Sequence, residues 1–170
     1  MDNIILIGFM GSGKTAVGKK LAKKTGREFI DIDAEIVKRE GMPIKKIFED
    51  YGEKYFRKAE TETARIILKK KNRVVAAGGG IVVKKSNISL LKKGGTVVYL
   101  KNSFLRSAER LKGKTDRPLF TDLKKARQLY NSRLGLYEKA ADIKVFTDKK
   151  TVSMTADAVK KKTEGSGCGQ

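Results

Sequence analysis

The sequence of 170 residues predicts an α/β fold in which a parallel sheet lies between two layers of helices. Short apolar runs alternate along the chain with segments whose apolar residues recur at helical spacing, and this alternation is typical of β-α-β units. A glycine-rich turn joins the first apolar run to the first helical segment, as expected for a unit of this kind. No internal repeat or linker interrupts the pattern, so we expect one domain over residues 1–163.

Five apolar runs are the expected strands. Each is four or five residues long and almost wholly apolar, which indicates strands buried on both faces. The last run contains Lys144, which favours a place at the edge of the sheet. The strands are expected at Ile4–Ile7, Phe29–Ile32, Val74–Ala77, Thr96–Leu100 and Ile143–Phe146.

Helical segments separate these runs. Gly26 is placed to end the first helix, and Pro43 is placed to open a short helix that continues through Phe48. The longest helix is expected over residues 51–70, and its inward stripe consists of Phe56, Ala59, Thr63, Ile66 and Ile67. Further helices are expected at about residues 14–25, 87–93, 104–111, 124–139 and 151–162.

The chain is strongly basic, with 39 Lys and Arg against 19 Asp and Glu and a net charge of +20. Such a charge attracts nucleotides, anionic substrates and, less specifically, nucleic acid. The lysine pairs are spread over the polar positions of many helical segments, so we interpret them as solvated helix surface and expect no nucleic-acid partner. The absence of histidine excludes histidine-based triads, general bases and metal sites.

The sequence also bounds the location of the protein. No apolar run approaches the ~20 residues of a membrane-spanning helix, and the chain enters its first strand without room for a signal peptide. The single cysteine, Cys168, lies in a Gly/Ser-rich tail over residues 164–170 that is typical of disorder. With no disulfide possible within the chain, we expect a cytoplasmic protein without a membrane partner, and a monomer.

The glycine-rich turn, Gly8-Phe-Met-Gly-Ser-Gly-Lys-Thr15, has the spacing of a phosphate-binding loop. In such a loop the backbone N–H groups surround the phosphates, and the next helix directs its positive N-terminus at them. Lys14 would neutralise the outer phosphates and the Thr15 hydroxyl would bind Mg²⁺. The alternative is a turn without a ligand, but its place between a strand and a helix favours a nucleotide site.

Two carboxylates follow the second expected strand. Asp31 and Asp33 are two residues apart, so in a strand they project to the same side, at the sheet edge where α/β proteins bind ligands. One could hold Mg²⁺ or its water while the other meets a substrate hydroxyl. The alternative for Asp33 is that it caps a helix beginning at Ala34.

Two further features lie in the middle of the chain. Gly78-Gly79-Gly80 follows a buried strand, which favours close approach of a ligand to the backbone over a plain flexible turn. Arg57 borders an apolar stripe and has Glu60 three residues later, a spacing at which the carboxylate can orient the guanidinium. Taken alone, that pair is also an ordinary helix ion pair.

Two arginines occur later in the chain. Arg133 lies on or beside the apolar stripe of its helix and there needs an anionic partner, either a structural acid such as Glu138 or Glu60, or a substrate carboxylate. Arg117 lies in a cationic, glycine-bearing segment that could close over ATP. The alternative for that segment is a solvated charged loop.

Taken together and in this order, the motifs resemble the shikimate kinases, which are P-loop kinases similar to nucleoside-monophosphate kinases. The resemblance covers most of the chain up to Thr147 and includes GFMGSGKT (8–15), DID (31–33), IFEDYGEKYFRKAE (47–60), VVAAGGGIV (74–82), RPL (117–119) and RLGLYEKAAD (133–142). It implies a three-layer α/β/α P-loop kinase fold, with a five-stranded parallel sheet in the order 2-3-1-4-5 and a lid at about residues 112–122.

The resemblance also implies an activity, the ATP- and Mg²⁺-dependent phosphorylation of the 3-hydroxyl of shikimate on the route to chorismate and the aromatic amino acids. The implied ATP-binding residues are Gly11, Ser12, Gly13, Lys14, Thr15, Ala16, Arg110 and Arg117, with Thr15 and Asp31 at the metal. The implied shikimate-binding residues are Asp33, Arg57, Gly78, Gly79, Gly80 and Arg133. Lys14, Asp33 and Arg117 are the implied catalytic residues.

Two other functions fit parts of the pattern. A kinase of the same type could phosphorylate a nucleoside monophosphate or a sugar acid such as gluconate, although two arginines and a carboxylate suit a small polyhydroxy acid better. A nucleotide-gated protein could instead use its positive surface to bind nucleic acid. Such a protein would have no need of the second set of polar residues.

Overall fold

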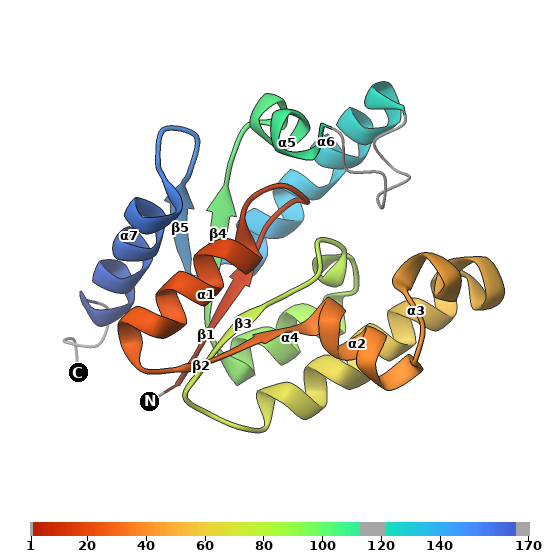
Figure 1. The fold of residues 1–170 in the computed structure, drawn as a ribbon, viewed down its shortest axis with the longest axis horizontal. Coiled ribbons are helices and arrows are strands. Elements are labelled where there is room, and N and C mark those ends of the chain that lie inside the picture. The colour runs from red at the N-terminus through yellow and green to blue at the C-terminus, as the bar shows by residue number, and fades with distance from the viewer. Residues whose placement is uncertain (1, 113–121, 166–170) are drawn as a thin grey trace.

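The computed structural model describes residues 2–112 and 122–165, and in this part of the chain a parallel sheet forms the centre (Figure 1). Its strands are β1 (Asn3–Ile7), β2 (Glu28–Asp31), β3 (Arg73–Ala76), β4 (Gly95–Lys101) and β5 (Ile143–Phe146). They lie side by side in the order β2-β3-β1-β4-β5, and every neighbouring pair is parallel. The expected fold class and strand order are confirmed, and the Lys144 strand is indeed at an edge.

Helices cover both faces of this sheet (Figure 1). Residues of α1 and α7 pack against one face in a single apolar cluster, while residues of α2, α3, α4 and α6 belong to the cluster on the other face. The helices are α1 (Lys14–Thr25), α2 (Ile32–Glu40), α3 (Ile44–Leu68), α4 (Lys85–Gly94), α5 (Phe104–Leu111), α6 (Leu123–Ala140) and α7 (Val152–Gly165), with a short 3₁₀ turn, η1 (Ile81–Val83).

The central strand β1 explains why the strands read as continuous apolar runs. Ile4 and Leu6 belong to the cluster with α1 and α7, whereas Ile5 and Ile7 belong to the cluster on the opposite face. All four side chains are almost completely buried. Each such side chain contributes about 1.5–3 kcal/mol by leaving water, so both faces of the strand are stabilised by burial.

The second strand ends earlier than the apolar run indicates. Asp31 is its last residue, and α2 begins at Ile32. Asp31 caps that helix, because its side chain accepts a hydrogen bond from the backbone N–H of Asp33 at 3.1 Å. The cap therefore belongs to Asp31, and the alternative in which Asp33 caps a helix beginning at Ala34 is wrong.

The region expected to hold two helices is one helical stretch with a kink. Gly52, with φ 78° and ψ 174°, interrupts α3, and glycine adopts a backbone with this positive φ at little cost.

Ile66 was expected on the inward stripe of this helix, but it is 57% exposed, so that expectation is wrong. At the other end of the chain, α7 includes residues 164 and 165, which composition had assigned to the tail.

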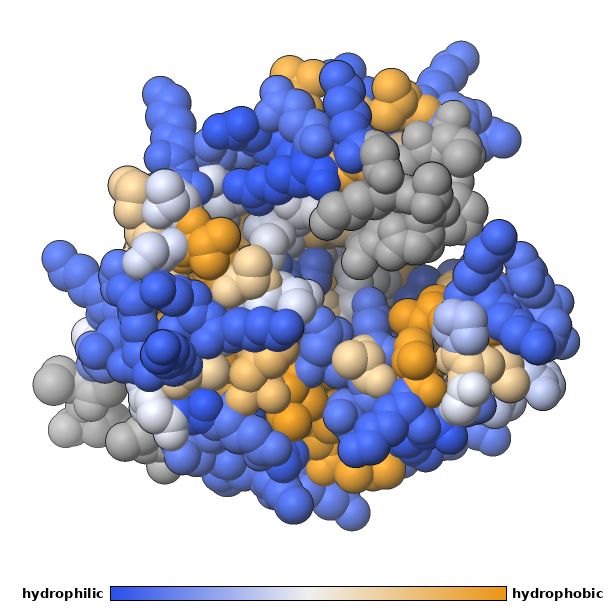
Figure 2. Space-filling model, viewed as in Figure 1, coloured by the Kyte–Doolittle hydropathy of each residue, from blue (hydrophilic) through white to orange (hydrophobic). Residues whose placement is uncertain are grey.

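The lysine pairs lie mostly on exposed surface, as expected. Several occupy the last turn of a helix, including Lys23 and Lys24 of α1 and Lys92 and Lys93 of α4, and none of these four is buried. The negative end of the helix dipole favours cations there. On the face drawn in Figure 2, hydrophilic side chains spread over most of the surface instead of gathering in one patch.

Of the helices that the structure describes, none has the length and apolar character needed to cross a membrane.

Candidate active site

The phosphate-binding sequence forms the turn between β1 and α1. Gly11 and Gly13 have φ values of 79° and 92°, in the left-handed region that favours glycine. Gly13 is the N-cap residue of α1, and no side chain caps this helix. The first N–H groups of α1 therefore lack a side-chain acceptor from the cap position, an arrangement suited to an anion.

Two cationic side chains hold the shape of this loop. The Lys14 ammonium donates to the backbone oxygens of Gly8 and Phe9 at 2.8 and 3.1 Å. Arg110, from α5, donates through Nη1 to the oxygen of Gly11 at 3.0 Å. Both charges thus lie against the turn in which the sequence predicts the phosphates.

Thr15 and Asp31 lie together beside the loop. The Thr15 hydroxyl donates to Oδ2 of Asp31 at 2.8 Å. A hydroxyl next to a carboxylate supplies the hard oxygen ligands that Mg²⁺ prefers, and this ion usually takes only one or two protein ligands beside phosphates and water. Between residues 2 and 112 and between 122 and 165, no three acidic, histidine or cysteine side chains gather as a metal cluster. The donor set fits a magnesium ion shared with a nucleotide.

Asp33 lies at a different part of the site. A Cβ built on Gly78 would be 2.7 Å from Oδ1 of Asp33, so this carboxylate lies directly against the glycine triplet. The expected strand alternation is therefore wrong, because α2 begins between the two aspartates and turns Asp33 away from Asp31. Asp31 contacts Thr15 of the phosphate loop, whereas Asp33 borders Gly78.

Arg57 of α3 is held by two carboxylates. Its Nη1 donates to Glu60 at 2.8 Å, and its Nε and Nη2 both donate to Oε1 of Glu53 at 3.2 and 3.1 Å. Burial lowers the pKa of Arg57, but the two carboxylates outweigh this effect and raise it overall. The guanidinium lies so close to Gly80 that a Cβ there would collide with it. A side chain at position 80 would therefore force the guanidinium of Arg57 to move.

Glu60 is the buried member of this network. Its residue surface is 0% exposed, and burial raises the pKa of its carboxyl, with Arg57 acting in the opposite direction. Its Oε1 has no hydrogen-bond partner among the described residues and lies against Gly78, where a Cβ would be 2.6 Å away. Glu60 thus fixes Arg57 from the interior side of the site.

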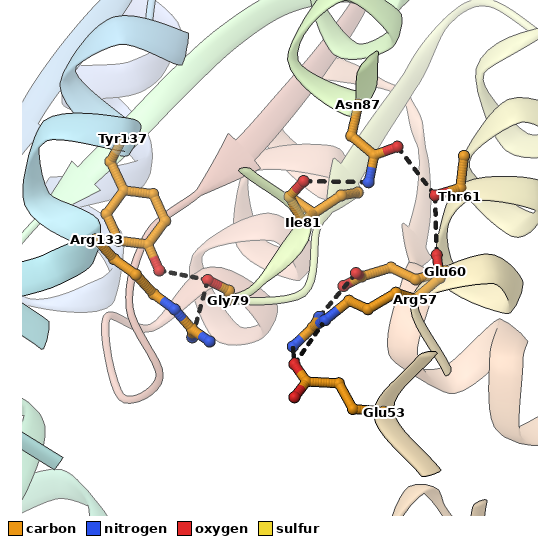
Figure 3. A network of polar contacts seen from close by, with 9 residues as sticks. All are labelled: Glu53, Arg57, Glu60, Thr61, Gly79, Ile81, Asn87, Arg133 and Tyr137. Carbon is orange, nitrogen blue, oxygen red and sulfur yellow. Dashed lines mark hydrogen bonds and ion pairs between the residues drawn. The ribbon is translucent and has the colours of Figure 1, made fainter. Parts of the chain in front are cut away.

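Arg133 of α6 reaches the glycine triplet from the opposite side (Figure 3). The residue is only 8% exposed, and its Nη1 donates to the backbone oxygen of Gly79 at 3.3 Å. Glu138, one of the two structural acids that the sequence offers as its partner, instead pairs with Lys101 and Lys144. In the part of the chain that the structure describes, Arg133 forms no ion pair, and its Nε has no hydrogen-bond partner.

Some residues of this network were not singled out from the sequence. Glu53 lies four residues before Arg57, and Tyr137 lies four after Arg133; helical spacing of i and i+4 is the signal that could have indicated both contacts. A second link has no local signal. Thr61 donates to Asn87 at 3.0 Å, and Asn87 donates to the oxygen of Ile81 at 3.1 Å, which ties α3 to the segment after the glycine triplet.

Arg117 and most of the expected lid lie outside the described residues. Ser12 is buried within the loop, and Ala16 is exposed on the first turn of α1. Two cavities of about 470 and 640 Å³ lie elsewhere, at the amino ends of the strands. Both are lined by Asp2 and Thr96, near the starts of β1 and β4. Neither contains a residue of the site, which is therefore identified by its chemistry and not by cavity size.

The described residues thus bring a phosphate loop, the oxygen atoms of Thr15 and Asp31, and two arginines around a glycine triplet to one edge of the sheet.

A shikimate kinase family model matches residues 10–164. A shikimate kinase from Sulfurihydrogenibium sp. (strain YO3AOP1) is 44% identical over 160 residues, which cover 94% of this chain and 96% of that relative.

Solved structures agree with this match. The shikimate kinase from Acinetobacter baumannii in complex with shikimate has a TM-score of 0.95 and 34% identity, covering 99% of this chain and 96% of that one. The shikimate kinase from Aquifex aeolicus has a TM-score of 0.87 and 37% identity, covering 99% of both chains.

Proposed function

Because the chain belongs to the shikimate kinase family, we propose that it transfers the γ-phosphoryl group of ATP to the 3-hydroxyl of shikimate, giving shikimate 3-phosphate. The reaction is one step towards chorismate and the aromatic amino acids. We expect the protein to be cytoplasmic, because the reaction consumes ATP. We expect a monomer, because the proposed reaction requires neither a second chain nor a membrane.

The observation that carries this proposal is the buried guanidinium of Arg133. It is 8% exposed and donates to a neutral carbonyl, that of Gly79. Glu60 attracts this charge without forming a direct ion pair with it, and a buried charge that lacks a direct partner costs several kcal/mol, so the site favours an anionic ligand. Arg57 points towards the same space from α3 (Figure 3), and two guanidinium groups suit a carboxylate held by paired hydrogen bonds.

The phosphate side of the site has its own division of roles. Lys14 and the N-terminus of α1 neutralise the phosphates, and Gly11 to Ala16 together with Arg110 surround the nucleotide. Thr15 and Asp31 would hold Mg²⁺, which would supply positive charge to neutralise the phosphates. Arg117 of the lid stabilises the transferring phosphoryl group.

Asp33 meets the acceptor. Its position against Gly78, away from the Thr15–Asp31 pair, supports a contact with substrate and not with metal. Asp33 accepts a hydrogen bond from the 3-hydroxyl, orients its oxygen towards the γ-phosphorus and receives its proton. Gly78, Gly79 and Gly80 allow the substrate and the side chains that bind it to approach the backbone closely.

A panel of acceptors tests this function directly. The purified protein is incubated with ATP and Mg²⁺, and ADP release is measured with shikimate, gluconate or a nucleoside monophosphate as the acceptor. We expect rapid turnover with shikimate alone. Faster turnover with gluconate or the nucleotide would assign another acceptor to the same site, and ATP-dependent, salt-sensitive binding of DNA without turnover would replace the kinase altogether.

A further inference from the structure

Tyr137 shares a hydrogen-bond acceptor with Arg133. The two residues lie one turn apart on α6, and both donate to the backbone oxygen of Gly79 (Figure 3). The phenol makes the shorter bond, while the Nη1 of Arg133 is 3.3 Å from the oxygen. A carbonyl oxygen has two lone pairs, so it accepts from both donors at once, and the closer phenol makes the Gly79 oxygen a weaker acceptor for the guanidinium.

The ring of Tyr137 is fixed in this position. Tyr137 is 0% exposed and stacks on Tyr99 of β4, with ring centroids 5.1 Å apart and planes inclined by 26°. Burial raises the pKa of Tyr137 to about 12, although the Arg133 guanidinium next to the phenol acts in the opposite direction, so the hydroxyl remains a donor at neutral pH. The phenol is thus a permanent and neutral partner for Gly79.

Arg133 is held less firmly by protein atoms. Its contact with Gly79 is long for a hydrogen bond to a guanidinium, and its buried Nε has no hydrogen-bond partner among the described residues. Without the phenol, the Gly79 oxygen would keep the guanidinium as its remaining side-chain donor. The arginine would then move closer to that oxygen and away from an incoming anion.

We propose that Tyr137 is a positioning residue, which occupies the Gly79 oxygen and thereby leaves the guanidinium of Arg133 available to the carboxylate of the acid substrate. This role rests on the proposed function, because it concerns the ligand of Arg133. The proposed effect is on binding of the acid, through the guanidinium of Arg133.

The test compares two tyrosine variants. Tyr137→Phe removes the hydroxyl and keeps the ring, and we expect the KM for shikimate to rise about 3- to 10-fold, with the KM for ATP and kcat nearly unchanged. Tyr130→Phe is the matched control. It removes another buried phenol, whose bond to the oxygen of Asn102 is 2.6 Å long, from the same helix. We expect the control to lose similar thermal stability and to keep its KM for shikimate.

Two further measurements separate positioning from a general loosening of the fold. With the carboxamide of shikimate as acceptor, the difference between Tyr137→Phe and the wild type should vanish, because the carboxylate is absent. In the background of Arg133→Ala, adding Tyr137→Phe should not raise the KM further. A rise of equal size in that background, or with the carboxamide, would overturn the proposal.

The outcome also distinguishes this role from the function on which it rests. If the wild-type protein phosphorylates shikimate and Tyr137→Phe has the same KM as Tyr130→Phe, Tyr137 has no positioning role and the kinase assignment stands. If the wild-type protein does not phosphorylate shikimate, the proposed function fails first, and the role of Tyr137 with it.

Discussion

Gly78 and Glu60 lie so close that a Cβ on the glycine would be 2.6 Å from Oε1 of the carboxylate. The same added atom would be 2.7 Å from Oδ1 of Asp33. Two side chains of the site therefore occupy the volume that any other residue would fill. The backbone of Gly78 does not have a positive φ, so the preference for glycine here comes from this packing, and a side chain would force one of the two carboxylates to move.

We expect Gly78→Ala to impair both stability and activity. Overpacking of this kind costs about 1–3 kcal/mol, and relief requires Asp33 or Glu60 to move. Turnover should fall at least about tenfold, because the acceptor contact of Asp33 is displaced. Gly135→Ala is the control: a Cβ there meets nothing within 4 Å, and alanine should stabilise the helix by about 0.5–1 kcal/mol. Urea unfolding and steady-state kinetics measure both effects, and normal activity in Gly78→Ala would contradict the packing.

Arg133→Ala should chiefly weaken binding of the acid substrate. A buried guanidinium that pairs with the substrate carboxylate contributes about 2–4 kcal/mol to the free energy of binding, so its loss corresponds to a rise in Kd of about 30- to 800-fold. Calorimetric titration with shikimate measures this loss, and Lys139→Ala on the exposed side of the same helix is the control. An unchanged Kd in Arg133→Ala would show that the carboxylate binds elsewhere.

Asp31→Asn should separate the structural and metal roles of this residue. Asparagine caps helices as well as aspartate does, so α2 should keep its stability and the thermal midpoint should change little. The loss of negative charge beside Thr15 should raise the Mg²⁺ concentration needed for half-maximal turnover by about 10- to 100-fold. If a magnesium titration of the variant matches that of the wild type, Asp31 does not support the metal. Removal of Mg²⁺ with a chelator should abolish turnover in both proteins.

Glu53→Gln should tighten binding of the acid. The Glu53 carboxylate is 67% exposed and accepts from the Nε and Nη2 of Arg57, the edge that a substrate carboxylate would use. Exposed pairs of this kind contribute about 0.2–1 kcal/mol, so their removal should lower the KM for shikimate about 2- to 3-fold. Glu49→Gln removes a comparable exposed charge from α3 and should have no such effect. A higher KM in Glu53→Gln would show that Glu53 orients Arg57 and does not compete with the substrate.

Glu60→Gln should change how stability depends on pH. Burial raises the pKa of Glu60 above its ordinary value of 4.5, so the folded protein holds the proton more tightly than the unfolded chain does. The contribution of Glu60 to the free energy of unfolding is therefore complete below about pH 4.5 and is lost as pH rises through the raised pKa. The stability of the wild type relative to Glu60→Gln should thus fall as pH rises from about 4.5 through the raised pKa of Glu60. Urea unfolding at several pH values measures it, and a difference that grows with pH would contradict this assignment.

Local patterns in the sequence were enough to predict the layers, the strands and the phosphate loop. Apolar runs such as Ile4–Ile7 can only be buried on both faces, and a loop with glycine at positions 11 and 13 can adopt left-handed backbone without strain. These features depend on residues close together in the chain. Their errors include boundaries, such as the start of α2 at Ile32 and the kink at Gly52, and one inward position, Ile66, which is exposed.

Tertiary structure decided the partners of the charged residues. Whether Arg133 meets Glu138, Glu60 or a backbone oxygen depends on contacts between α6, α3 and the segment after β3, and these are set by packing over long separations in the chain. Whether Asp31 and Asp33 reach the same part of the site likewise depends on where a helix begins, since Asp31 contacts Thr15 and Asp33 borders Gly78. Periodicity fixes which face of an element is buried, but only the folded arrangement brings specific polar atoms within hydrogen-bonding distance of one another.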